Sequence, residues 1–347
     1  MSPDDVRGLK ADSATLDAGI ASRKRAAPAK KPLPLALALA VYDRTKPIID
    51  GSVKPEGLKL KINTGWIGDF CTRPVYEDYD AAEMSLSWYV AAHGRGEPCI
   101  ALPVFPLRMA VLGYVFCRAD APYTHPSQLV GKRIASTGYR YTVNLWLRGM
   151  LKDHYGLAPE QVSWFTTVKD EGAGYRIPAG IDVTVVTDKT PGEMLIAGDV
   201  DAVIGPEAPD EFLKGDPRIR RLFADARAEQ AAYFKKTGIY PITHTVVMKK
   251  SLAEEKPWVA ESLFHAFRDA QRACTDYYYK NAKHVSFPSA LFFMEEERRD
   301  YGPEPWVNGF APTRHVIETF VRYAHEQGYI ARRPAVEELF APNTLGL

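Results

Sequence analysis

Short apolar runs alternate with amphipathic segments along most of this chain. Residues 35–41 form an apolar run bounded by turn-forming residues, and residues 58–62 alternate between apolar and charged residues with a period of two. Residues 142–156 instead place their apolar side chains at helical spacing. Strands that alternate with helices form mainly parallel sheets covered on both faces, so the pattern predicts an α/β fold.

Residues 190–193 carry a strong signal for the start of a helix. Thr190 is a typical N-cap, Pro191 suits the first helical position, and Glu193 stands where it can complete a capping box. The helix is expected to stop near Gly198, between predicted strands at 181–187 and 200–204.

A polar, proline-containing stretch around residues 118–122 indicates a passage between lobes, and a return passage is predicted near residues 238–248. They make the first lobe discontinuous, with residues 34–118 and 245–347 in lobe 1 and residues 119–244 in lobe 2. Residues 1–33 are predicted to be a disordered tail. This layout is that of a type 2 periplasmic-binding-protein-like fold, in which two mixed sheets flanked by helices enclose a central cleft.

The bulk composition favours a soluble protein with local recognition. The chain has 347 residues, enough for two cores, and its formal net charge is +1. A net charge this small produces no strong electrostatic field that would attract a nucleic acid or an anionic membrane. No apolar run approaches the roughly 20 residues that span a bilayer. The basic and then apolar sequence at 23–41 is similar to an export signal, but the run is short and leads into a charged turn. We expect a cytoplasmic protein, with the periplasm as the alternative.

The four cysteines lie far apart in the sequence. Cys71, Cys99, Cys117 and Cys274 show no metal-ligand spacing, so we interpret them as free thiols. There is also no GxGxxG motif and no His/Asp/Glu cluster with ligand spacing. We predict no cofactor and leave a divalent metal ion open, together with a possible homo-oligomer.

Polar residues follow several predicted strands at their carboxyl ends, where open α/β sheets bind ligands. Helix N-termini there offer free N–H groups, hydroxyls add donors, and arginine can grip a carboxylate with two bonds. The sequence therefore predicts a small-anion site between the lobes. Its candidate residues are Asp43, Arg44, Glu83, Ser85, Ser87, Arg108, Tyr139, Arg140, Thr142, Glu207, His244 and Thr245.

Each candidate also has a plainer interpretation. Ser85 and Thr142 can serve only as helix N-caps, and Glu207 can cap the helix that follows it. Asp43 and Arg44 can pair with each other at the surface. A lone histidine such as His244 is more often structural than catalytic, although its position between lobes favours function.

Seven segments, in order over about residues 35–345, resemble the 4,5-dihydroxyphthalate decarboxylase family. They are YDRT at 42–45, VKPEGL at 53–58, AEMSLS at 82–87, PVFP at 103–106 with Arg108, WLRG at 146–149, TGIYPITHT at 237–245 and EELFAP at 337–342. Within WLRG, Arg148 lies inside a predicted helix, and we interpret it as a solvated or salt-bridged residue of the helix surface.

The chain departs from the family pattern at two places that we expect to face the cleft. Relatives usually carry an Arg-His pair where this chain has Val111 and Leu112, and they tend to carry an acidic residue where it has Gly138. Both departures suggest a changed substrate or a lost reaction.

The resemblance implies a carbon–carbon lyase that removes CO₂ from a dihydroxylated aromatic carboxylate, so the expected partner is a small anionic aromatic ligand. Arg44, Arg108 and Arg140 would position carboxylates. His244 would act as general acid or polarise a ring hydroxyl.

Either Asp43 or Glu83 would orient that histidine or accept the phenol proton. Ser85, Ser87, Tyr139, Thr142, Glu207 and Thr245 would complete the substrate-binding set. The alternative is a solute-binding protein for a small carboxylate, part of a transport system.

Overall fold

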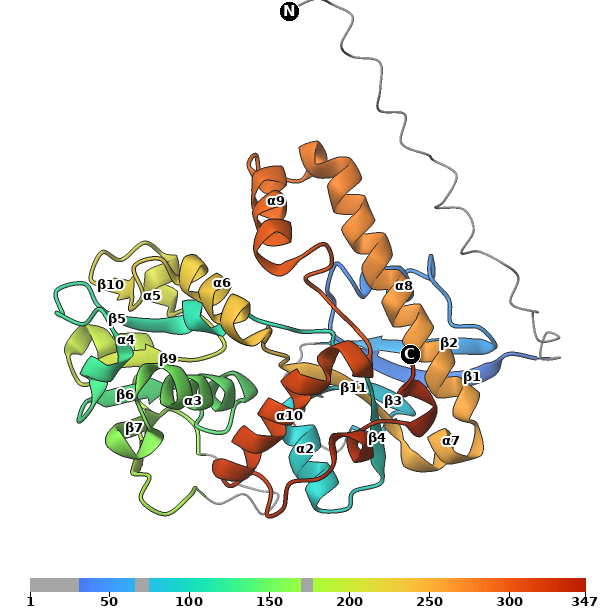
Figure 1. The fold of residues 1–347 in the computed structure, drawn as a ribbon, viewed down its shortest axis with the longest axis horizontal. Helices are drawn as coiled ribbons and strands as arrows, with labels where there is room; N and C mark the ends of the chain where they lie inside the picture. Colours follow the sequence, from blue (N-terminus) through green and yellow to red (C-terminus); the bar gives the residue numbers. More distant parts are fainter. Residues whose placement is uncertain (1–30, 66–74, 170–176) are drawn as a thin grey trace, which may run out of the picture.

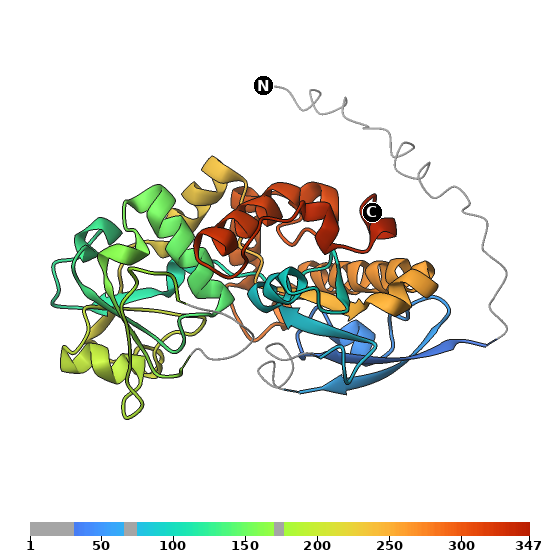
Figure 2. The ribbon, with the colours of Figure 1, turned by 90° about the horizontal axis from the view of Figure 1, so that it is seen from below.

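The computed structural model describes residues 31–65, 75–169 and 177–347. Most of the predicted tail, as well as Cys71, lies outside these residues. Figures 1 and 2 show two sheets at opposite ends of the molecule, with α2, α3 and α10 gathered between them. The predicted two-lobed α/β architecture with two mixed sheets is confirmed.

The first sheet has the strand order β2-β1-β3-β11-β4. Its strands are β1 (Leu33–Leu39), β2 (Leu58–Thr64), β3 (Ala81–Ser85), β4 (Cys99–Leu102) and β11 (His244–Lys249). Strand β1 is parallel to β2 and β3, and β11 is antiparallel to β3 and β4. A segment from late in the sequence thus lies between two early strands.

The second sheet has the strand order β10-β5-β9-β6-β7-β8. Its strands are β5 (Val115–Arg118), β6 (Arg133–Ser136), β7 (Ser163–Thr166), β8 (Val183–Val185), β9 (Ala202–Ile204) and β10 (Ile219–Arg221). Strand β5 pairs with β9 and β10. The predicted lobe boundary after residue 118 is therefore wrong by one strand, because the chain passes to the second sheet between β4 and β5.

Ten α-helices and six short 3-10 helices of the described residues connect and cover these strands. The α-helices are α1 (Lys46–Ile49), α2 (Leu86–Gly94), α3 (Thr142–Tyr155), α4 (Pro191–Ala197), α5 (Asp210–Leu213), α6 (Ala226–Thr237), α7 (Lys250–Glu255), α8 (Pro257–Asn281), α9 (Ala290–Tyr301) and α10 (Phe310–Glu326). The 3-10 helices are η2 (Val111–Tyr114), η3 (Pro126–Leu129), η4 (Pro159–Gln161), η5 (Ala282–His284), η6 (Val336–Leu339) and η7 (Pro342–Thr344).

Helix α4 begins as its sequence predicts. The Thr190 hydroxyl accepts a hydrogen bond from the backbone N–H of Glu193 at 3.1 Å, and the Glu193 carboxylate accepts one from the N–H of Thr190 at 2.7 Å. The helix ends at Gly198, whose φ of 78° lies in the left-handed region that glycine adopts without strain.

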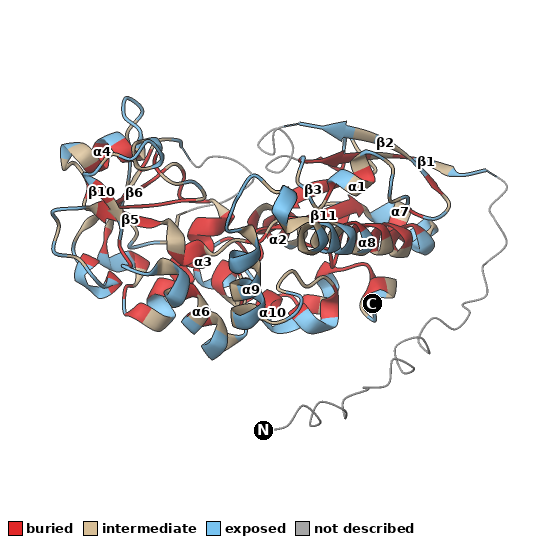
Figure 3. Cartoon of the chain, turned by 90° about the horizontal axis from the view of Figure 1, so that it is seen from above, coloured by how far each residue is buried: buried red, intermediate tan, exposed pale blue. Residues whose placement is uncertain are grey.

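One hydrophobic core runs through both lobes. Met84 of β3 and Trp164 of β7 belong to the same cluster of buried residues, although they lie in different sheets. A second core fills the space between α8 and the first sheet, where Val246 and Leu263 meet. Figure 3 shows the buried positions of α8 turned towards that sheet. Because packed interiors resist deformation, the shared core favours a fixed arrangement of the lobes.

Helix α9 joins the lobes on a second side. It follows α8 and packs on α6 (Figure 1), where Arg227 forms ion pairs with Asp300 at 2.6 Å and with Glu296 at 3.2 Å. The rings of Phe234 and Tyr301 lie 5.2 Å apart beside these pairs.

Cys99, Cys117 and Cys274 are free thiols, as predicted. Burial raises the pKa of Cys99 and Cys274 to about 12, which is typical of unreactive thiols. Separately, none of the helices within 31–65, 75–169 and 177–347 has the length and apolar character that a membrane crossing requires.

Candidate active site

A buried carboxylate and an imidazole pair between β3 and β11. Antiparallel pairing sets His244 opposite Ser85 and Val246 opposite Glu83, so Glu83 and His244 lie diagonally on one face of the sheet. His244 Nδ1 lies 2.6 Å from Glu83 Oε1. Glu83 is fully buried, and the His244 side chain is 11% exposed.

Two further donors fix the Glu83 carboxylate. The Tyr42 hydroxyl donates to Oε1 at 3.0 Å, and the backbone N–H of Ala40 donates to Oε2 at 3.1 Å. A carboxylate that accepts a hydrogen bond from the Nδ1–H group holds the imidazole in one orientation. The other ring nitrogen, Nε2, is then the one that can act on a ligand. Of the two acids predicted to orient His244, the structure places Glu83 against it.

Three hydroxyl groups join the lobes beside this pair. Ser85 is the N-cap residue of α2, and Thr142 is the first residue of α3. Their hydroxyl oxygens lie 2.6 Å apart, and the Thr142 hydroxyl also donates to Ser87 Oγ at 2.8 Å. Two helix N-termini from different lobes thus converge beside His244. The positive ends of the two helix dipoles favour an anion, whereas the first N–H groups of α2 already donate, Leu86 N–H to the Thr243 carbonyl at 2.8 Å and Ser87 N–H to Thr142 Oγ1 at 3.1 Å.

Two of the predicted arginines lie close to these elements. The Arg140 guanidinium lies 4.1 Å from the centre of the Trp88 ring, and the Arg140 carbonyl accepts from Ser87 Oγ at 3.5 Å. Arg44 follows β1, and its guanidinium lies between the rings of Tyr42 and Trp306. Arg140 and Thr142 of the second lobe therefore contact Ser85 and Ser87 of the first.

Arg108 is a buried cation without an acidic partner among the described residues. It is 6% exposed, its Nη2 donates to the carbonyl of Val307, and its Nε has no hydrogen-bond partner there. Burial lowers the pKa of this guanidinium to about 9. A buried unpaired charge is costly, and an anionic ligand would offset that cost.

Replacing Arg108 with methionine should separate a binding role from a structural one. An apolar chain of similar length removes the desolvation cost, so the free energy of unfolding should stay constant or rise by about 1–4 kcal/mol. The affinity for an aromatic dicarboxylate should fall about 100-fold. Calorimetry measures both quantities. Arg118→Met at an exposed ion pair is the control, and a strongly destabilised Arg108→Met protein would contradict the binding role.

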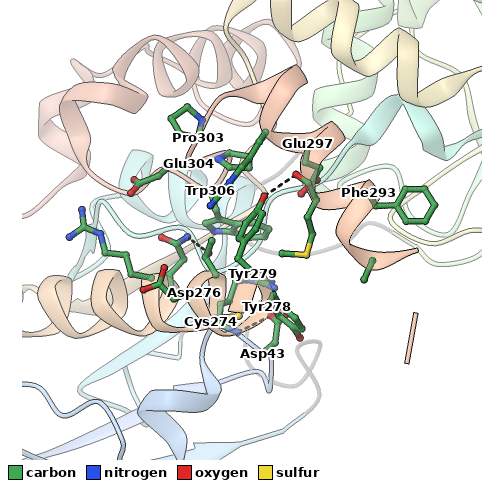
Figure 4. Close-up of a pocket in the computed structure, with 18 of the residues that line it drawn as sticks. Asp43, Cys274, Asp276, Tyr278, Tyr279, Phe293, Glu297, Pro303, Glu304 and Trp306 are labelled. Carbon is green, nitrogen blue, oxygen red and sulfur yellow. Dashed lines mark hydrogen bonds and ion pairs between the residues drawn. The ribbon is translucent and has the colours of Figure 1, made fainter. Parts of the chain in front are cut away.

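A cavity of about 700 Å³ lies between α8, α9 and the loop after β1. Asp43 and Arg44 form part of its lining, and the Glu83–His244 pair lies outside it. Figure 4 shows Asp43 at its base, with Tyr278 and Tyr279 of α8 beside it. The sequence identified the two residues at the base but gave no sign of this cavity.

Two predicted binding residues have other roles in the structure. Tyr139 is buried, and its ring packs on Arg148 and Trp164. The Thr245 hydroxyl lies on the face of β11 opposite to His244 and donates to the carbonyls of Leu102 and Val104. Both side chains therefore act in packing.

Glu207 is exposed in the bend after β9, and no hydrogen bond or ion pair among the described residues joins it to those around His244. Asp43 is 46% exposed and forms an ion pair with Arg44 at 3.2 Å. The plainer interpretation of an Asp43–Arg44 pair thus holds, and both residues also line the cavity.

The two departures from the family pattern do not open the site. Val111 and Leu112 are fully buried in the core shared by the lobes, so the prediction that they face the cleft is wrong. The Gly138 carbonyl accepts hydrogen bonds from Ser136 Oγ at 3.1 Å and from Asn144 Nδ2 at 2.6 Å. Its backbone thereby shapes the loop before α3.

Sequence reasoning missed Tyr42 and Trp306, which flank Arg44, and misread Arg148. Tyr42 lies in the YDRT segment, and its position at the end of β1 could have identified it. Arg148 is 1% exposed and donates to three oxygens, those of Gln327, Tyr139 and Tyr329. Its interpretation as a solvated residue is wrong, because the segment that follows α10 and the loop before α3 enclose it.

No three His, Cys, Asp or Glu side chains within the described ranges are grouped as a metal site would require.

Comparison with solved structures identifies the fold. The chain matches a periplasmic sulfonate-binding protein of Methylobacillus flagellatus with a TM-score of 0.59 and 14% identity, over 91% of this chain and 94% of that one. It matches the aliphatic sulphonate binding protein of Escherichia coli with a TM-score of 0.54 and 13% identity, over 89% and 92%. At this identity the likeness shows the type 2 binding-protein fold alone.

Comparison with curated sequences is more specific, although no protein-family model matches the chain. A 4,5-dihydroxyphthalate decarboxylase of Pseudomonas putida is 31% identical over 211 residues, which cover 58% of this chain and 82% of that protein. Another, from Comamonas testosteroni, is 33% identical over 322 residues, which cover 90% of this chain and 98% of that protein. Near-complete coverage at this identity shows that the chain belongs to the 4,5-dihydroxyphthalate decarboxylase family.

Proposed function

We propose that this protein decarboxylates a dihydroxylated aromatic dicarboxylate such as 4,5-dihydroxyphthalate at the Glu83–His244 pair. The observation that carries the proposal is the buried carboxylate–imidazole contact, 2.6 Å long, beside two helix N-termini. Buried titratable pairs of this kind are typical of acid–base sites. The names of the relatives support the choice of substrate.

The reaction needs one proton and releases one CO₂. A hydroxyl para to the departing carboxylate supplies electrons to the ring, and the ring carbon that bears this carboxylate takes up the proton. The carbon–carbon bond then breaks, CO₂ leaves, and the bonding electrons return to the ring. The hydroxyl regains any proton it gave up. The product is a dihydroxybenzoate.

The residues divide this work between binding and proton transfer. His244 Nε2 delivers the proton, while Glu83 and Tyr42 hold the imidazole in place. Arg108 and Arg140 bind the carboxylates, assisted by the hydroxyls of the Ser85–Thr142 contact. Confining the reactant between fixed groups lowers the barrier because little orientation entropy remains to be lost.

The direct test uses the purified full chain and 4,5-dihydroxyphthalate. We expect CO₂ and 3,4-dihydroxybenzoate to form in a 1:1 ratio. The assay is run with a chelator and, separately, with added divalent cations, so that a metal requirement would be detected. Absence of product in every arm, with the substrate bound, would reject the decarboxylase.

The fold likeness to sulfonate-binding proteins supports a second candidate, a solute-binding protein for a small carboxylate. It predicts binding without turnover and a mature protein in the periplasm. The decarboxylase proposal includes a cytoplasmic location, so fractionation of cells that express the chain separates the two candidates.

A further inference from the structure

The cavity between α8 and α9 has aromatic walls and a charged base. Tyr278 and Tyr279 of α8 and Trp306, which follows α9, lie along it, and Phe293 of α9 lies at its outer edge (Figure 4). One face of the Tyr279 ring is covered by the Arg298 guanidinium, 3.3 Å from the ring centre. Aromatic rings of this kind stack on a flat ligand at favourable ring distances. The cavity volume of about 700 Å³ is in the range of small-molecule sites.

Arg44 is held rigidly at the base of this cavity. Its guanidinium carbon lies 4.1 Å from the centre of the Tyr42 ring and 4.2 Å from that of Trp306, and its Nε donates to the carbonyl of Pro106. Nη1 binds Asp43 at 3.2 Å, whereas Nη2 has no hydrogen bond to any residue described. A guanidinium fixed between two rings loses little freedom when it binds a carboxylate.

A single side chain, that of Tyr42, separates Arg44 at the base of the cavity from the proposed reaction centre. The Tyr42 ring that Arg44 covers carries the hydroxyl that donates to Glu83 Oε1 at 3.0 Å. His244 approaches the same oxygen at 2.6 Å. A molecule bound against Arg44 would therefore lie beside the Tyr42–Glu83–His244 chain.

The remaining polar groups suit hydroxyl groups on the ligand ring. Gln271, Glu297 and Asp43 line the cavity and offer oxygen acceptors. A hydroxylated aromatic acid combines hydroxyl donors for such acceptors with a carboxylate for Arg44.

We propose that this cavity is a second subsite for hydroxylated aromatic acids, in which the reactant stacks on the aromatic wall and places a carboxylate on Arg44 before it reaches His244. This inference rests on the proposed function for the identity of the ligand. It assigns α9 to substrate capture, and it makes Phe293 and Arg44 determinants of affinity.

Two neighbouring residues of α9 provide a matched test. Phe293 lines the cavity and is 56% exposed, whereas Phe292 lies outside its lining and is 66% exposed. Phe293→Asp should raise the KM for 4,5-dihydroxyphthalate about tenfold and change kcat less than twofold, since a carboxylate on the wall repels the ligand. Phe292→Asp should leave both constants unchanged. Equal effects of the two variants, or none from Phe293→Asp, would overturn the subsite.

Binding of phthalate separates this inference from the proposed reaction. Phthalate has no ring hydroxyl to drive decarboxylation, so calorimetry measures its Kd whether or not the protein is an enzyme. Phe293→Asp and Arg44→Gln should each raise this Kd about tenfold, and Phe292→Asp should not. If no CO₂ forms but this contrast appears, the reaction fails and the subsite stands. If CO₂ forms and the contrast is absent, the subsite fails.

Discussion

Replacing His244 with alanine should lower kcat by about 10²- to 10⁴-fold, the range that a positioned general acid contributes. The imidazole is the titratable group that Glu83 orients at 2.6 Å, and its removal leaves the carboxylate without a proton to pass on. Substrate binding should remain, because Arg108, Arg140 and the hydroxyls of Ser85 and Thr142 are unchanged. Steady-state kinetics gives kcat, and calorimetry gives the Kd.

Two companion measurements show whether the effect is catalytic. His325→Ala removes an exposed histidine from α10 and should leave kcat as it was. Added imidazole should restore part of the activity of His244→Ala, since a small acid can occupy the vacated space. Full turnover by His244→Ala would remove this residue from the mechanism, and loss of substrate binding would assign it to recognition instead.

The lobes and the position of the site could be predicted from sequence because they depend on local patterns. Strand ends at residues 42–45 and 82–87 carry the polar groups, and sheet topology brings such ends together. The Glu83–His244 contact joins residues 161 positions apart. Their types and strand-end positions were visible, but the register between β3 and β11 decided that Glu83, and not Asp43, meets the histidine.

The predictions from sequence failed where the burial of a residue depends on segments far away in the chain. β5 ends just before the polar stretch at residues 119–122, so its four residues looked like the end of the first lobe. Its pairing with β9 and β10 has no local signal. The cavity between α8 and α9 depends on how two helices pack, which no spacing within either helix reveals.

Arg148 is the clearest example of a residue whose burial the sequence did not reveal, because distant segments pack around it. A Cβ added at the neighbouring Gly149 would overlap the ring of Tyr323, so α3 and α10 approach too closely there for any other residue. The guanidinium lies 3.7 Å from the centre of the Tyr139 ring and donates to Gln327 Oε1 at 2.8 Å, the Tyr139 carbonyl at 2.7 Å and the Tyr329 hydroxyl at 3.0 Å. It thus ties the loop before α3 to the segment that follows α10.

Replacing Arg148 with methionine should therefore lower the free energy of unfolding by about 3–5 kcal/mol, the cost of breaking a buried charged network. Three buried oxygens lose their donor, and an apolar chain cannot replace it. Denaturant unfolding measures the change. Activity should fall as well, because the Tyr139 carbonyl that Arg148 holds immediately precedes Arg140 and lies close to Thr142.

Arg322→Met is the matched control, since Arg322 also joins α10 to α3, through Asp153 at 2.5 Å, but its side chain is 32% exposed. Exposed pairs contribute about 1 kcal/mol or less. If Arg148→Met fails to fold, Tyr329→Phe removes one acceptor alone and should cost about 1–2 kcal/mol. Equal losses for Arg148→Met and Arg322→Met would mean that burial adds nothing to the arginine contact. The fixed arrangement of the lobes would then depend on the shared apolar core alone.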